Sequence, residues 1–183
     1  IGLHCRRGIV LADDAIDLQR YAIESDVLVL IARQQPMATD LRTLAAILEI
    51  VNDLERIGDY AKGIAKITRL MADLPNVPVL PQIPAMAARA QDMLSRALEA
   101  FLRRDVATAR AIPREDDQVD ALYNEVNRAM MELTIQDPTK MELANYLVWA
   151  AHNLERSADR VTNICERAVF TVTGDMKELD AER

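Results

Sequence analysis

One motif of eight residues occurs twice in this chain, and its two copies start 100 positions apart. Residues 52–59 read NDLERIGD, and residues 152–159 read HNLERSAD. Both copies contain Leu-Glu-Arg, with an aspartate four residues after the glutamate. Residues four apart lie above one another on one face of an α-helix, so each copy stacks two carboxylates. The motif therefore predicts two related helical units, each carrying an acidic pair.

Other segments repeat at similar offsets. Residues 9–17 (IVLADDAID) align with 112–120 (IPREDDQVD), and the QQP at 34–36 aligns with the QDP at 136–138. The offset falls from 103 to 102 and then to 100, which indicates two copies of one unit separated by short deletions. Half of the residues are hydrophobic and only 4% are aromatic, a composition that favours helices.

The hydrophobic pattern predicts an all-α fold. We expect helices at about residues 12–33, 37–71, 85–111, 114–136 and 139–173. The prolines at every third position of 75–84 make residues 74–84 an extended linker. The expected domains are a bundle at 1–73 and a bundle at 85–174, followed by a tail at 175–183. The fold is predicted to be two tandem antiparallel three-helix bundles, with residues 1–8 the stump of the first bundle's N-terminal helix.

Four acidic pairs with a spacing of four residues occupy equivalent places in the two units. They are Asp13/Asp17, Glu55/Asp59, Asp116/Asp120 and Glu155/Asp159. Asp17 and Glu55 each lie 19 residues from Pro36, and the corresponding separations in the second unit are 18 and 17. Antiparallel helices that leave a turn advance by the same rise per residue. Each motif should therefore face an acidic pair on the preceding helix.

Facing carboxylates repel one another unless they are protonated or bridged by cations. Oxygen donors suit hard ions such as magnesium, manganese, calcium or iron, and bidentate carboxylates can bridge several ions. A single acidic pair is more often an exposed helix surface, but four pairs at matched heights favour a metal site. Asn52, Asp53 and Asn153 are possible secondary ligands. His152 is interpreted as a non-ligand, because Asn52 takes its place in the first copy.

Composition and motifs argue against several other functions. There are 22 basic and 29 acidic residues, and this net charge of -7 argues against a nucleic-acid partner. The two cysteines have no disulfide-framework or zinc-site spacing, which is typical of a reduced, cytosolic setting. The sequence shows no signal peptide, no apolar run long enough to span a bilayer, no nucleophile motif and no glycine-rich phosphate loop.

The segment QQPMATDLR at 34–42, followed by NDLERIGD, resembles the PhoU family of phosphate-transport regulators. HNLERSAD with Asn163 and Ile164 is similar to that family's second copy, and the resemblance covers about residues 9–174. It implies multinuclear metal clusters of iron, zinc, manganese or magnesium. The ligands it implies are Asp13, Asp17, Glu55, Asp59, Asp116, Asp120, Glu155 and Asp159.

The resemblance also implies a role without catalysis. The protein would be a cytosolic homodimer that docks on the ATPase or permease of the phosphate ABC transporter and on a sensor histidine kinase. It would reach the membrane only through these partners, and would keep the phosphate-starvation (Pho) response off. Two alternatives stay open: a carboxylate-bridged multimetal enzyme in a helical bundle, and a metal-free helical adaptor.

Overall fold

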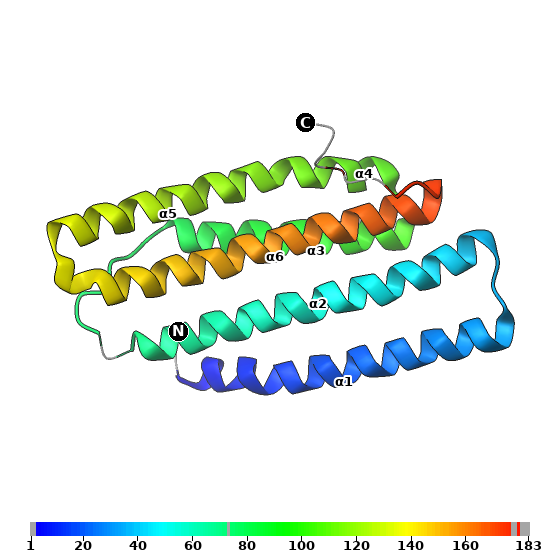
Figure 1. Ribbon diagram of the computed structural model, residues 1–183, viewed down its shortest axis with the longest axis horizontal. Helices are drawn as coiled ribbons and strands as arrows, with labels where there is room; N and C mark the ends of the chain where they lie inside the picture. The colour runs from blue at the N-terminus through cyan, green and yellow to red at the C-terminus, as the bar shows by residue number, and fades with distance from the viewer. Residues whose placement is uncertain (1–2, 73, 177–178, 180–183) are drawn as a thin grey trace.

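The computed structural model describes residues 3–72, 74–176 and 179, with side chains from residue 15 onward (Figure 1). Throughout this part of the chain the regular elements are helices, as predicted. They are α1 (Leu3–Gln34), α2 (Ala38–Leu70), α3 (Gln82–Arg103), α4 (Val106–Ala111), the 3-10 turn η1 (Ile112–Glu115), α5 (Asp116–Gln136), the 3-10 turn η2 (Pro138–Lys140) and α6 (Met141–Thr173). No described helix contains an apolar stretch that could cross a membrane.

α1 and α2 form an antiparallel pair around the turn at Pro36. The expectation that residues 1–8 are the stump of a separate helix is wrong for residues 3–8, which continue α1. Residues 1 and 2 lie outside the described part. A glycine inside a helix costs only about 1 kcal/mol relative to alanine, so Gly8 does not end α1. In the turn between the two helices, Gln35 and Ala38 have positive φ angles of 47° and 49°.

The single helix expected at 85–111 is two helices. Arg104 adopts the left-handed conformation (φ 57°) at the C-terminus of α3. Asp105 then caps α4 by accepting a hydrogen bond from the Thr108 amide at 3.0 Å. α3 also begins earlier than expected, at Gln82, because Pro84 fits a first helical turn, where an N–H group has no intrahelical partner. The extended linker is correspondingly shorter.

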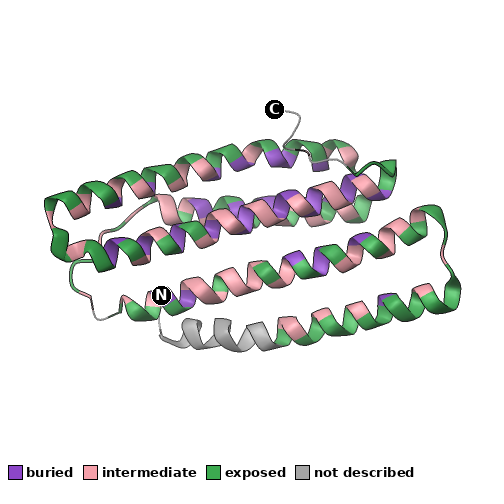
Figure 2. Ribbon diagram, in the orientation of Figure 1, coloured by how far each residue is buried: buried purple, intermediate pink, exposed green. Residues whose placement is uncertain are grey.

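α6 is the central helix of the molecule, and α2, α3 and α5 all pack against it. Its last turn ends at Gly174 (φ 80°), whose amide donates to the Phe170 carbonyl oxygen at 2.9 Å. Figure 2 shows the buried positions running along most of α6. The largest fully buried side chains are Met86, Met93, Ile112, Val119, Val126, Val161, Ile164 and Cys165. Leu54, Ile57 and Ile64 of α2 pack against the same cluster, so the two repeats share one core.

The antiparallel α2/α6 contact is roughly symmetric. Asp53 on α2 accepts hydrogen bonds from Asn163 Nδ2 at 3.3 Å and from Arg160 Nη1 at 3.5 Å. At the equivalent place of the other repeat, a Cβ atom added at Gly63 would lie 3.2 Å from Asn153 Oδ1. Residues 53 and 153, like 63 and 163, are equivalent in the sequence repeat. An approximate twofold axis therefore passes through this contact.

The two repeats differ in how far their hairpins are covered. In the second repeat, α5 packs against both α6 and α3. In the first repeat, α1 packs along α2, and its outer face carries the exposed side chains of Leu18, Tyr21 and Leu28. Figure 2 shows that most of the described part of α1 is exposed.

Candidate metal-binding faces

The eight predicted ligands fall on two surfaces. The α1/α2 face comprises Asp13, Asp17, Glu55 and Asp59, and the α5/α6 face comprises Asp116, Asp120, Glu155 and Asp159. The side chain of Asp13 lies outside the described part of the structure. Asp116 is buried, and the other six side chains are half-buried between their helices.

Contacts across the α5/α6 hairpin show the predicted register. The rings of Tyr123 on α5 and His152 on α6 lie with their centroids 5.9 Å apart. The charge of Asp120 on α5 reaches Glu155 on α6 and contributes to raising its pKa. The acidic pairs on these two helices therefore lie at the same height, as their distances from Pro138 predict.

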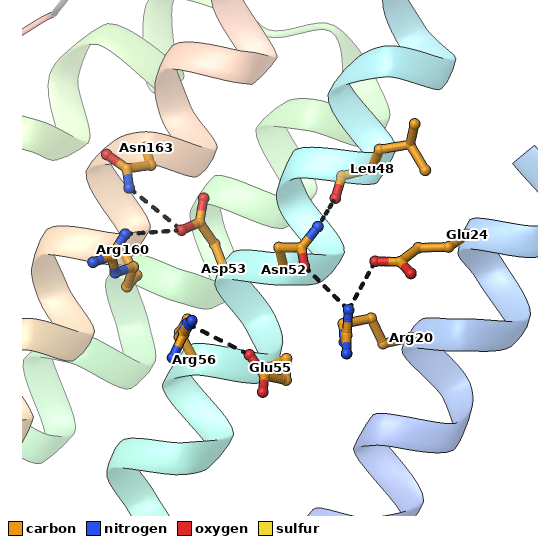
Figure 3. A network of polar contacts seen from close by, with 9 residues as sticks. All are labelled: Arg20, Glu24, Leu48, Asn52, Asp53, Glu55, Arg56, Arg160 and Asn163. Carbon is orange, nitrogen blue, oxygen red and sulfur yellow. Dashed lines mark hydrogen bonds and ion pairs between the residues drawn. The ribbon is translucent and has the colours of Figure 1, made fainter.

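The α1/α2 hairpin has the equivalent register. A Cβ atom added at Gly58 would lie 3.1 Å from the Ile16 Cδ1 atom. Arg20 Nη1 donates to Asn52 Oδ1 at 3.3 Å (Figure 3). Ile16 and Arg20 flank Asp17, which therefore lies at the level of Glu55 and its neighbours. Packing against Ile16 explains why position 58 needs a small residue.

Glu155 on the α5/α6 face has a perturbed electrostatic environment. Burial raises the pKa of this carboxyl, and the charges of Asp159 and Asp120 raise it further, while His152 and Arg156 oppose the shift. Its Oε2 atom is shielded from solvent and makes no hydrogen bond. His152 Nδ1 lies 3.2 Å from this atom, close enough for an ion pair but without hydrogen-bond geometry. A cation placed here would relieve both the burial and the repulsion.

Arginines surround the carboxylates of the α1/α2 face. Glu55 Oε2 lies 3.7 Å from Arg56 Nε, and its charge reaches the Arg20 guanidinium. Arg20 Nη1 also donates to Glu24 Oε1 at 2.9 Å (Figure 3). The side chain of Glu55 is as exposed as that of Glu155, at 20%. The two glutamates are thus equally exposed but have different neighbours, since Arg20 lies near Glu55 whereas Asp159, Asp120 and His152 lie near Glu155.

The donor set fits a metal ion in its chemistry. Carboxylates from two helices lie at one height on the α5/α6 face, and the Oε2 atom of Glu155, which accepts no hydrogen bond, could accept a cation. Among the described side chains, no three Asp, Glu, His or Cys residues already enclose a metal position. Metal binding would therefore require partly exposed carboxylates such as Asp159 to rotate inward.

Several neighbours of the acidic faces were not predicted from the sequence. Arg20 and Tyr123 occupy equivalent positions at the repeat offset of 103, and an alignment of the two copies would have shown this. Asp53 was predicted as a possible secondary ligand, but its carboxylate bonds to Asn163 and Arg160 in the α2/α6 contact. Burial raises the pKa of Asp53, against the lowering influence of these two partners.

The fold and the two faces together define an all-helical protein built from a duplicated hairpin with carboxylates between its helices. Multi-carboxylate metal sites in helical bundles are built in this way. The family profile described as PhoU domain matches this chain twice, over residues 4–68 and 83–168. The chain belongs to the PhoU family.

Named relatives match most of the chain. A protein from Clostridium acetobutylicum is 33% identical over 94% of this chain and 79% of its own length. A protein from Caulobacter vibrioides is 34% identical over 97% of this chain and 76% of its own length. Both are named phosphate-specific transport system accessory protein PhoU homologues.

Two crystal structures have the same fold. The phosphate transport system regulatory protein PhoU from Streptococcus pneumoniae superimposes with a TM-score of 0.85 at 30% identity, covering 94% of this chain and 81% of that one. PhoU from Pseudomonas aeruginosa gives a TM-score of 0.88 at 30% identity, covering 93% and 82%. The duplicated helical architecture is therefore that of PhoU proteins.

Proposed function

We propose that this protein is an accessory regulator of phosphate uptake. The observation that carries this proposal is the family match over both repeats, together with relatives that are named accessory proteins of the phosphate transport system. In this role the protein docks on the phosphate ABC transporter and on its sensor histidine kinase from the cytoplasmic side. It acts as a homodimer and keeps the phosphate-starvation response off when phosphate is plentiful.

The proposed mechanism includes metal binding at both acidic faces. Bound ions, of iron, zinc, manganese or magnesium, would supply positive charge that neutralises each face and joins its two helices. Glu55 and Asp59 would hold them with Asp17 and Asp13, and Glu155 and Asp159 would hold them with Asp120 and Asp116. The buried Oε2 atom of Glu155, which accepts no hydrogen bond, supports this assignment. Because ligands that bind the folded state stabilise it, metal would stiffen the surface offered to the partners.

The proposed regulator has no turnover of its own. The acidic faces serve to order two helical hairpins, and their carboxylates bind and orient without moving protons or groups. Hydrolysis of a phosphoester or reduction of oxygen by the metal-loaded protein would contradict this proposal and favour the enzyme alternative.

Deletion of the gene in the source organism tests the regulatory role. Expression of phosphate-uptake genes should rise at high phosphate in the deletion strain and return to normal with a wild-type copy. A copy carrying Glu155→Gln and Asp159→Asn tests the α5/α6 face. A matched copy carrying Asp26→Asn and Glu132→Gln changes two exposed carboxylates outside both faces and should restore repression fully. Normal repression in the deletion strain would contradict the role.

A further inference from the structure

The two acidic faces differ at one matched pair of positions. At the offset of 103, Arg20 on α1 corresponds to Tyr123 on α5, and at the offset of 100, Asn52 on α2 corresponds to His152 on α6. Arg20 contacts Asn52 across the α1/α2 hairpin, and Tyr123 contacts His152 across the α5/α6 hairpin. The same place beside the carboxylates therefore holds a guanidinium and an amide in one repeat, but a phenol and an imidazole in the other.

On the α1/α2 face this place is already occupied by polar contacts. Arg20 Nη1 donates to both Glu24 and Asn52, and Asn52 Nδ2 donates to the Leu48 carbonyl oxygen at 2.7 Å (Figure 3). Both ends of the Asn52 amide are thus used. The side chain of Arg20 is only 17% exposed, so its charge is held close to the face. A fixed positive charge opposes the binding of a second cation beside it.

On the α5/α6 face the same place offers a nitrogen donor. His152 Nδ1 lies 3.2 Å from the Oε2 atom of Glu155, and the ring centroid of Tyr123 lies 5.9 Å from that of the imidazole. His152 and Glu155 are three residues apart on α6, which puts both donors on one side of the helix. Glu24 corresponds to Asn127 at the offset of 103, so the arginine and the glutamate of the first repeat are both replaced by uncharged residues.

We infer that the two faces select different metal ions, and that His152 is a ligand of the α5/α6 face together with Glu155. Imidazole nitrogen combined with carboxylate oxygen favours a borderline ion such as Zn²⁺, whereas carboxylate oxygens alone suit hard ions such as Mn²⁺. The α5/α6 face is the tighter site and prefers zinc. The α1/α2 face is an oxygen-only site weakened by Arg20. This inference rests on the proposed metal binding, and it is an alternative to the interpretation of His152 as a non-ligand.

The direct test is His152→Asn, which places in the second repeat the residue found in the first. The full chain is stripped of metal, and its affinities for ZnCl₂ and MnCl₂ are measured by equilibrium dialysis with elemental analysis. We expect His152→Asn to weaken zinc binding at least about tenfold and to change manganese binding by less than about twofold. Glu132→Gln, at an exposed position outside both faces, should change neither affinity.

Nuclear magnetic resonance supplies a second readout. The chain has two histidines, His4 and His152, so His152→Asn assigns the imidazole nitrogen signals unambiguously. Addition of ZnCl₂ should shift the ring nitrogen signals of His152. A reciprocal variant tests the α1/α2 face. Glu155→Gln with Asp159→Asn first removes the α5/α6 carboxylates. Arg20→Tyr with Asn52→His, added to that protein, should then raise the zinc affinity of the α1/α2 face.

The outcomes distinguish a failure of this inference from a failure of the proposed metal binding. If His152→Asn binds zinc and manganese in the same ratio as the wild type, and zinc leaves the His152 nitrogens unshifted, the inference is overturned while metal binding stands. If the wild type binds neither metal better than a variant with all of Glu55, Asp59, Glu155 and Asp159 replaced by their amides, the proposed metal binding fails as well.

Discussion

The hairpins α1/α2 and α5/α6 are built to one plan but have different surroundings. Both place their acidic pairs at one height, on either side of a proline turn. The position that is fully buried in α5, Val126, corresponds at the offset of 103 to Ile23 in α1, which is 39% exposed. The turn and the periodicity of the helices set the register within each hairpin. The packing of α3 sets the burial, because α3 packs against α5, whereas α1 is packed along α2.

The same contrast applies to the acidic faces. The motif carboxylates are retained in both repeats, but the residues that meet beside them are Arg20 and Asn52 in one and Tyr123 and His152 in the other. Carboxylates of the same type therefore lie in different electrostatic surroundings. A duplicated motif is not by itself evidence of two equivalent sites.

The largest expected effect is on the free energy of unfolding, when equivalent apolar residues of the two hairpins are truncated. Val126→Ala should lower the free energy of unfolding by about 2 kcal/mol, because it leaves a cavity at a fully buried position. Ile23→Ala removes a larger group but from a partly exposed place, and should cost less than about 1 kcal/mol. Urea denaturation followed by circular dichroism measures both. An equal or larger loss for Ile23→Ala would show that the outer face of α1 is covered in solution, and would contradict the difference in burial between α1 and α5.

The next largest effect is on stability, when the small residues at the equivalent motif positions 58 and 158 are exchanged. Ala158→Gly should cost about 1 kcal/mol, since glycine is the poorer helix former and Ala158 is fully buried. Gly58→Ala should gain less than about 1 kcal/mol, because the new methyl group would lie 3.1 Å from Ile16 Cδ1 and this side chain must shift. Thermal unfolding of the two variants measures the difference. A full gain at Gly58 would show that Ile16 packs loosely against α2.

The smallest effect concerns the charges of the faces in the metal-free protein. Glu155→Gln should raise the free energy of unfolding at pH 7 by about 0.5 kcal/mol, because it removes a like-charge pair with Asp159 and a poorly solvated carboxylate. The matched Glu55→Gln should give no gain, because Arg56 and Arg20 lie near that glutamate. Chemical denaturation in the presence of a chelator measures both variants. A gain of equal size at Glu55 would remove the electrostatic distinction between the faces.

The pH dependence of this effect has a defined sign. The pKa of Glu155 is raised in the folded state, so its ionised form destabilises the fold at neutral pH. The wild type should recover this loss as the pH falls through the raised pKa towards the ordinary glutamate value of about 4.3, whereas Glu155→Gln should not. The stability difference between the two proteins should therefore shrink on acidification. A difference that grows on acidification would contradict the raised pKa.

The sequence predicted the long helices and their register well, because proline turns and equal counts of residues constrain antiparallel pairs strongly. It did not predict the break between α3 and α4. That break relies on Arg104 in a left-handed conformation, and no glycine or proline marks the place. It also assigned residues 1–8 to a separate helix, whereas residues 3–8 continue α1.

The candidate site was predicted in part for a similar reason. The acidic pairs follow from spacing along one helix, which the sequence shows directly. Their neighbours Arg20 and Tyr123 come from the opposite helix, and their importance depends on which residues meet across the hairpin. The contact of Asp53 with Asn163 and Arg160 depends on how the two repeats pack together, which a count of residues within one hairpin does not give.

Anomalous X-ray diffraction at the zinc absorption edge, from crystals of the full chain grown with ZnCl₂, tests the central claim most directly. We expect a strong anomalous peak on the α5/α6 face, within bonding distance of His152 and Glu155. We expect a weaker peak or none on the α1/α2 face beside Arg20. Equal peaks on both faces, with His152 turned away from the metal, would contradict the difference between the repeats. Anomalous density at neither face would contradict the proposed metal sites altogether.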